Sequence, residues 1–344
     1  MKTNLNAIDC FSGCGGLSEG LRKAGFRVCA GIEIREDASR SYALNHPKAK
    51  KYSDIREVDA KQILSDLNIE VGALDLLAGC PPCQGFSTMR TLKRSTSTSD
   101  PRNELIFDFI HLAEDMLPKV VLMENVPALL NDGRIIEAIR RLKAAGYVWV
   151  KAEVRDAADF GVPQRRKRMI LMASRLGPIE LPTGDSTLRS NVRKAIGSLG
   201  LPECSNRPLH RMHMNHSENV MNRIRRIPKN GGSRSALGED QLPCHRKSHG
   251  FNDVYGRMKW EDVAPTITRS CHNPSKGRFL HPEQDRAITL YEAMRLQSFP
   301  RSYRFTEGLS MTQIASMIGE ALPPKFAEAQ ARHIRRHIMT HCKF

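Results

Sequence analysis

Short apolar runs alternate with amphipathic stretches through the first half of the chain. The apolar runs predict strands at 5–10, 26–34, 73–78 and 119–123. The amphipathic stretches predict helices between them, at 17–25 and 104–116. Strands that alternate with helices are typical of a mostly parallel α/β sheet. The sequence therefore predicts a Rossmann-like α/β domain.

The second half of the chain contains an interval without this periodicity. Residues 186–285 hold seventeen Lys and Arg against nine Asp and Glu, an excess equal to half of the net charge of the chain. Asp253–Met258 and Thr266–Arg269 are expected to form strands within it. Helical periodicity returns over 310–341, where Pro323-Pro324 opens the last helix. We expect a second, smaller domain at 186–285.

The composition narrows the class of partner. The chain has 53 Lys and Arg against 37 Asp and Glu, a net charge of +16, which favours a polyanion such as nucleic acid. The alternative is a basic enzyme with no such partner. Nine irregularly spaced cysteines, no signal-peptide pattern and no apolar run near ~20 residues predict a reduced, cytoplasmic protein without a membrane partner. We expect a monomer.

A glycine-rich turn follows the first predicted strand. In Phe11-Ser12-Gly13-Cys14-Gly15-Gly16 the glycines let the backbone approach a ligand closely. Glu33 follows Gly13 by twenty positions, near the end of the next strand, where a carboxylate binds both hydroxyls of a ribose. The pattern indicates a dinucleotide or S-adenosylmethionine. Asp54-Ile55 offers a carboxylate and an apolar face to the adenine, or else Asp54 caps the following helix.

Gly79-Cys80-Pro81-Pro82-Cys83 places a thiol at the end of the strand at 73–78. Its C-x-x-C pair allows a redox disulfide, a metal ligand, a buried structural thiol or a nucleophile. The polar, basic segment 88–103 is expected to be a mobile loop able to close over a phosphate backbone. Glu124, at the end of the strand beyond it, is expected to converge on Cys83.

The run Gln164-Arg165-Arg166-Lys167-Arg168 is the most basic motif of the first half. In a strand, Gln164, Arg166 and Arg168 share one face, which suits a phosphate and a base edge. The alternative is a solvated strand end.

His210, His213, His216 and two Cys-His pairs suggest zinc, but their spacing matches no four-ligand site. We predict no metal.

These motifs resemble the cytosine-C5 DNA methyltransferases, in the order found in that family and over almost the whole chain. The matching segments are Phe11–Gly16, Pro81–Gln84, Glu124–Val126, Gln164-x-Arg166-x-Arg168, Arg286–Pro300 and Ile318–Pro324. Glu320 stands where that family often has asparagine. The resemblance implies a Rossmann-like class I S-adenosylmethionine-dependent methyltransferase sheet with a second, smaller DNA-recognition domain. It implies that residues 1–185 and 286–344 form a discontinuous catalytic and cofactor-binding domain, and that residues 186–285 form the DNA-recognition domain.

The resemblance also implies the site residues. Cys83 would be the nucleophile, Glu124 its partner at the base, and Arg166 and Arg168 would hold the target cytosine. The cofactor S-adenosyl-L-methionine, which leaves as S-adenosyl-L-homocysteine, would contact Phe11, Gly13, Gly15, Glu33, Ile34, Asp54, Ile55 and Gly79. DNA contacts are expected from Gln84, Ser87, Arg90, Arg102, Gln164 and Arg257.

The implied reaction is methyl transfer to C5 of a cytosine flipped out of a specific short duplex DNA sequence. It would proceed through a covalent bond between Cys83 and C6, with Glu124 at N3. A companion restriction endonuclease is expected to act separately. Three alternatives stay open: a tRNA cytosine methyltransferase, an oxidoreductase with a redox Cys80–Cys83 pair, and a DNA-binding pseudoenzyme.

Overall fold

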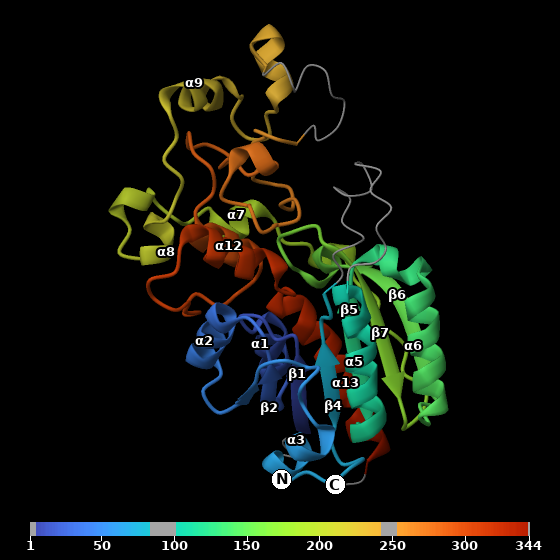
Figure 1. Cartoon of the computed structure of the whole chain (residues 1–344). Helices are drawn as coiled ribbons and strands as arrows, with labels where there is room; N and C mark the ends of the chain where they lie inside the picture. The colour runs from blue at the N-terminus through green and yellow to red at the C-terminus, as the bar shows by residue number, and fades with distance from the viewer. Residues whose placement is uncertain (1–4, 83–100, 242–252, 343–344) are drawn as a thin grey trace. The chain divides into compact units, whose positions relative to one another are not determined.

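The computed structural model describes residues 5–82, 101–241 and 253–342. The chain packs as two compact units (Figure 1). The first contains Met1–Ala157, Lys167–Gly184 and Leu322–Phe344, and the second contains Ala158–Arg166 and Asp185–Ala321. The interval 186–285 lies inside the second unit. Compactness does not test which residues recognise DNA, so the domain division stays a prediction.

The first unit is built on one sheet, which has seven strands among the residues that the structure describes, in the order β3-β2-β1-β4-β5-β7-β6. The strands are β1 (Leu5–Cys10), β2 (Phe26–Ile32), β3 (Lys50–Tyr52), β4 (Leu76–Gly79), β5 (Val120–Asn125), β6 (Trp149–Asp156) and β7 (Lys167–Ser174). Strands β1 to β5 run parallel, whereas β7 pairs antiparallel with both β5 and β6. The predicted α/β sheet is confirmed, and the carboxyl ends of β1, β2, β4 and β5 meet at one edge.

Helices complete the first unit. They are α1 (Gly16–Lys23), α2 (Glu36–Asn45), α3 (Ala60–Leu67), α5 (Leu105–Met116), α6 (Gly133–Ala144) and α13 (Pro324–His341), with short 3₁₀ helices η1 (Pro101–Glu104) and η2 (Pro127–Asn131). Alternate strand residues such as Ile8, Cys10, Val121 and Met123 share a hydrophobic cluster with α3, α5 and α6.

Helices α1 and α13 pack against each other. A Cβ on Gly20 would lie 2.5 Å from Ala327 Cβ, so the two helices approach more closely than a side chain at residue 20 allows. Figure 1 shows α5 in front of the sheet and α13 behind it.

The second unit is built from short helices and loops. Its helices are η4 (Ser186–Leu188), α7 (Val192–Ile196), η5 (Pro202–Cys204), α8 (Pro208–Arg211), α9 (Glu218–Arg226), η6 (Arg234–Asp240), η7 (Pro274–Lys276), α11 (Leu290–Leu296) and α12 (Met311–Glu320), and η3 (Ala157–Phe160) begins at the boundary. A small apolar cluster includes Ile224, Ile227 and Leu280. Where the unit is described, strand pairing is limited to isolated bridges. The predicted strands at 253–258 and 266–269 are therefore wrong.

Candidate active site

The turn between β1 and α1 has a left-handed backbone at three positions. The φ angles are 58° at Phe11, 53° at Gly13 and 100° at Gly15. Ser12 N donates to Ile32 O at 3.0 Å, and Gly15 N donates to Ser12 O at 2.8 Å. The glycines are needed because side chains rarely adopt this backbone conformation, and no described atom lies within 4 Å of the Cβ position at Gly13.

Glu33, the residue after β2, is brought onto this turn. Its Oε2 accepts a hydrogen bond from Gly13 N at 2.8 Å, and its Oε1 accepts one from Arg35 N at 2.8 Å. The next residue, Ile34, is 62% exposed. The sequence-predicted neighbours Gly13 and Glu33 are thus in direct contact, with an open apolar side chain beside them.

Two buried polar atoms near this turn have no hydrogen-bond partner among the residues that the structure describes: Asp9 Oδ1 and Ser12 Oγ. Ser18 Oγ donates to the other oxygen of Asp9 at 2.6 Å, and burial raises the pKa of Asp9 to about 7. The Glu33 carboxylate, the Ser12 hydroxyl and the open backbone at Gly13 together fit a nucleoside with ribose hydroxyls and a polar tail.

Three other predicted cofactor residues have contacts within the protein. Asp54 is bound by Arg56, whose hydrogen bonds keep the pKa of that carboxyl below its ordinary value. Asp59, and not Asp54, caps α3, so the alternative N-cap role of Asp54 is wrong. Ile55 lies in the hydrophobic cluster. A Cβ on Gly79 would lie 2.8 Å from the Phe109 ring, which gives Gly79 a packing reason for lacking a side chain.

The carboxyl end of β5 carries an ion pair. Arg168, near the start of β7, places Nε 2.7 Å from Glu124 Oε1 across the antiparallel ladder. Glu124 is 8% exposed, and the Arg168 side chain 16%. A carboxylate is thus kept at this edge by a guanidinium that fixes its orientation.

Asn125, the last residue of β5, is hydrogen-bonded to the Pro81-Pro82 segment, called the proline turn below. Its Nδ2 donates to Pro81 O at 3.0 Å, and its Oδ1 accepts from Val126 N at 2.8 Å. Sequence reasoning gave Asn125 no separate role, although an amide at the end of a central strand is a signal for such a contact.

Cys80 lies between this turn and Glu124. Burial, reinforced by the nearby carboxylates of Glu124 and Asp9, raises the pKa of the Cys80 thiol well above its ordinary value. A thiol that resists ionisation is a poor nucleophile. The predicted residues Cys83, Gln84, Ser87 and Arg90 lie outside the described residues, as does the side chain of Arg102.

Gln164 and Arg166 do not share a strand with Arg168, so the predicted common face is wrong. Strand β7 begins at Lys167, and the two residues belong to the second unit. The buried Gln164 side chain bonds Gln297 Oε1 at 2.8 Å and Ile267 N at 2.7 Å. The Arg166 guanidinium, 3% exposed, donates to the carbonyls of Ile267 and Gly319, each at 3.0 Å. These contacts give both side chains a structural role within the second unit, and their predicted contacts with the target base and DNA stay predictions.

Arg257 is a second correction. Its side chain is fully buried in the second unit and forms an ion pair with Asp285. The guanidinium also donates to the carbonyls of Ile224, Ile227, His281 and Gln284. It is a core residue and not an exposed DNA contact.

His210, one of the histidines considered for zinc, is hydrogen-bonded within the protein. His210 is hydrogen-bonded to Thr289 Oγ1 at 2.9 Å and to Gly200 O at 3.1 Å. In residues 5–82, 101–241 and 253–342, no group of three His, Cys, Asp or Glu could hold a metal ion.

Glu320, the departure from the family pattern, forms an ion pair with Arg269, with 3.4 Å between Glu320 Oε1 and an Arg269 guanidinium nitrogen. Across the same described ranges, no helix is both long and apolar enough to cross a bilayer.

The strand order, the antiparallel β7 and the glycine-rich turn that Glu33 contacts define the class of S-adenosylmethionine-dependent methyltransferases with a Rossmann-like fold. The family model for C-5 cytosine-specific DNA methylases matches residues 5–336. The chain therefore belongs to that family, and it is a DNA (cytosine-5)-methyltransferase that uses S-adenosylmethionine.

Individual relatives agree with this assignment. The chain is 36% identical to the type II methylase M.HgiDII of Herpetosiphon aurantiacus, over 96% of this chain and 95% of the relative. It is 32% identical to the type II methyltransferase M1.HphI of Haemophilus parahaemolyticus, over 96% and 87%. The fold is similar to that of a Spodoptera frugiperda DNMT2 mutant, with a TM-score of 0.69, 17% identity, and coverage of 96% of this chain and 100% of that one. The family match excludes the oxidoreductase alternative.

Proposed function

We propose that this enzyme methylates C5 of a cytosine flipped out of a specific short duplex sequence, through a covalent bond between Cys83 and C6 of the base. The observation that carries the proposal is the ion pair between the buried Glu124 and the half-buried Arg168 at the carboxyl end of β5. It lies beside the proline turn (Pro81-Pro82), which Asn125 hydrogen-bonds and which leads to Cys83. Buried, oriented ion pairs at such sheet edges are typical of active sites.

Cys83 would supply the nucleophile. C5 of cytosine is a weak nucleophile, and addition of a thiolate to C6 moves electron density onto C5. Cys83 comes two residues after Pro81, whose carbonyl Asn125 fixes, so the backbone that presents it is anchored to β5. C6 is inaccessible within a stacked duplex, and flipping the base costs a few kcal/mol. Burial and the nearby carboxylate of Glu124 raise the pKa of the Cys80 thiol, which favours Cys83 over Cys80 as the nucleophile.

Glu124 would bind the pyrimidine at N3. Negative charge develops on the ring as sulfur adds, and a proton shared between Glu124 and N3 stabilises it. Arg168, 2.7 Å from Glu124 Oε1, orients the carboxyl group so that its other oxygen faces the base.

The first-unit turn would hold the cofactor. S-adenosylmethionine, when bound, supplies an electrophilic methyl group. Glu33 would accept hydrogen bonds from the ribose hydroxyls, Ser12 and Asp9 would meet polar groups with their unpartnered atoms, and Ile34 would cover the adenine. After a C5–methyl bond forms, a base removes the C5 proton, the C5=C6 double bond re-forms and the Cys83–C6 bond breaks.

The relatives support a further part of the proposal. M.HgiDII and M1.HphI are named type II enzymes. We therefore also propose that a companion restriction endonuclease recognises the same short DNA sequence and acts separately from this enzyme.

Bisulfite sequencing of a duplex DNA library incubated with the enzyme and S-adenosylmethionine tests this function. We expect protected cytosines within one short sequence, and no protection with Cys83→Ser, which should still bind the cofactor. Cys80→Ser is the matched control, because it makes the same substitution three positions before Cys83. This variant should keep methylating DNA. Incorporation of labelled methyl into tRNA instead of DNA, or full activity of Cys83→Ser, would overturn the proposal.

A further inference from the structure

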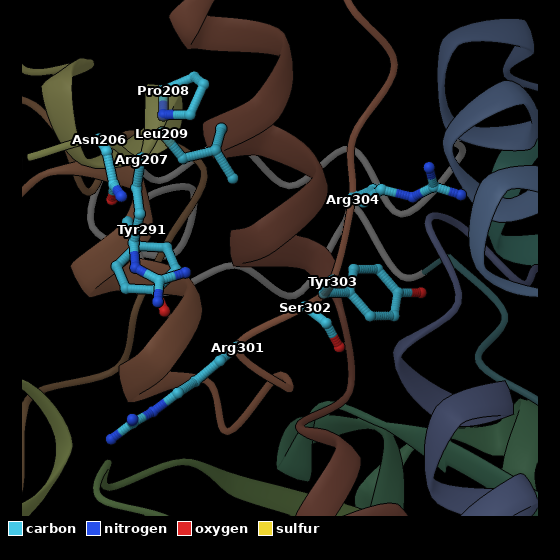
Figure 2. A pocket seen from close by; sticks show the side chains of 9 residues that line it. All are labelled: Asn206, Arg207, Pro208, Leu209, Tyr291, Arg301, Ser302, Tyr303 and Arg304. Atoms are coloured by element: carbon cyan, nitrogen blue, oxygen red, sulfur yellow. The ribbon is translucent and has the colours of Figure 1, made fainter.

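The second unit carries an open pocket of about 390 Å³, lined by residues 206–209, Tyr291 and 301–304 (Figure 2). Three of the lining side chains are arginines, and none of the lining residues is acidic. We propose that this pocket binds a phosphate of the DNA backbone through Arg207 and Arg301. The inference rests on the proposed function, since it assumes that the enzyme acts on DNA.

The Arg207 guanidinium lies over an aromatic ring. Its guanidinium lies 5.0 Å from the centroid of the Tyr291 ring, and Figure 2 shows the two side chains stacked. Tyr291 is only 3% exposed, whereas Arg207 is exposed. Stacking fixes the plane of the guanidinium while its N–H groups stay free at the edge to bind two oxygens of one phosphate.

Arg301 adds a second positive charge that is not neutralised. Across the described part of the chain, neither the Arg301 nor the Arg207 side chain forms an ion pair or a hydrogen bond. A third guanidinium, that of Arg295, donates to Phe299 O at 2.8 Å. Burial lowers the pKa of Arg295, and the charges of Arg301 and Arg207 lower it further against the opposing effect of Tyr291. The three arginines therefore repel one another, and a bound anion would relieve that repulsion.

The frame of the pocket is fixed before any ligand binds. His210, on α8, is hydrogen-bonded to Thr289, the N-cap of α11, which in turn forms a capping box with Glu292. Tyr303 is 6% exposed and packs against Phe299, with 4.6 Å between ring centroids. An arginine presented from such a frame loses little conformational entropy on binding.

Two other arginines of the same unit, Arg257 and Arg278, already form ion pairs within the protein. Arg257 is enclosed by carbonyls and Asp285, and Arg278 Nε lies 2.9 Å from Asp253 Oδ1. The side chain of Arg304 lines the pocket but extends away from Arg207 and Arg301 in Figure 2. The openness of the pocket suits a phosphodiester of a large ligand, although the same donors would accept a free phosphate.

The salt dependence of DNA affinity measures such a contact. Each neutralised phosphate contributes about 0.9 to the slope of log K against log salt concentration. We expect Arg207→Ala/Arg301→Ala to lower the slope for a random-sequence duplex by about 1 and to weaken binding about tenfold at low salt. Arg301→Lys should keep most of the slope, because a phosphate accepts a point charge. The methylated sequence should not change, because phosphate contacts carry no base information.

Arg304→Ala is the matched control, since it removes one exposed positive charge from the same pocket lining and should leave the slope close to that of the wild type. The proposal is overturned if the double variant keeps the wild-type slope, or if Arg304→Ala lowers it equally. Titration of the protein with inorganic phosphate distinguishes the other source: phosphate binding lost in the double variant with unchanged DNA affinity would assign the pocket to free phosphate. Methyl incorporation by the wild type is measured separately, so failure of the proposed function is recognised independently.

Discussion

Arg168 of the first unit has a different kind of partner from Arg166 and Arg257, two buried arginines of the second unit. In the first unit, Arg168 faces a single carboxylate, Glu124, at a strand end. In the second unit, Arg166 and Arg257 donate mainly to backbone carbonyls that lie far away in sequence. A guanidinium among carbonyls stabilises loops that lack strand pairing, whereas a buried ion pair is expensive to form and is more often kept for function. Burial of an arginine therefore does not by itself indicate a site; its partner does.

The largest effect should come from Arg168→Ala. Loss of the guanidinium leaves Glu124 without its orienting partner, and we expect kcat for DNA methylation to fall about 100-fold. Single-turnover methyl transfer, measured well below the unfolding temperature, checks this. Arg141→Ala, which breaks a similar pair with Glu114 between α6 and α5, is the control and should keep kcat within about threefold. Unchanged kcat in Arg168→Ala would remove the contrast between the units.

Arg257→Met should act on stability instead. Four carbonyls and Asp285 lose their donor, so we expect the free energy of unfolding to fall by about 3 kcal/mol. Urea denaturation measures the change, with the exposed Arg193→Met as a control expected within about 0.5 kcal/mol. If Arg257 were a DNA contact, as the sequence predicted, the variant would stay stable and lose DNA affinity.

A smaller, pH-dependent effect should come from His281. Burial lowers the pKa of His281 to about 4, and its Nδ1 accepts hydrogen bonds from the backbone of Glu283 at 3.2 Å and Gln284 at 3.0 Å. Below pH ~6.5 the unfolded chain binds a proton that the folded chain does not, so this histidine lowers stability as pH falls, by about 2 kcal/mol at pH 5.

Urea unfolding at pH 7.5 and pH 5 measures this contribution of His281 to the free energy of unfolding. The stability advantage of the wild type over His281→Gln should shrink by that amount between the two pH values. A stability difference between the wild type and His281→Gln that is the same at both pH values would contradict the assignment.

The sequence predicted the elements whose cause is local. Strand β1 has the predicted bounds Leu5–Cys10, and the last helix begins at Pro324, because apolar period and proline position decide such elements within a few residues. The contact between Gly13 and Glu33 could also be predicted from the sequence. Strands β1 and β2 are parallel neighbours, so the turn after β1 and the end of β2 lie at the same edge of the sheet.

The errors concern partners distant in sequence. Gln164, Arg166 and Arg257 look alike as basic or polar motif residues, but their partners lie between 24 and 153 positions away. His210 likewise has a distant partner, Thr289, which lies 79 positions on. No local period encodes such contacts, so the sequence indicated the chemistry of these side chains without indicating where they are used.

The central claim is a covalent bond from Cys83 to C6 of the target cytosine. Duplex DNA copied with 5-fluorocytosine in place of cytosine tests it most directly, because fluorine at C5 cannot leave as the proton does and the bond to sulfur then persists. Incubation with S-adenosylmethionine followed by intact mass measurement should give the mass of the protein plus one DNA strand plus one methyl group, with the DNA on the Cys83 peptide. Absence of this species, or its formation by Cys83→Ser, would contradict the account.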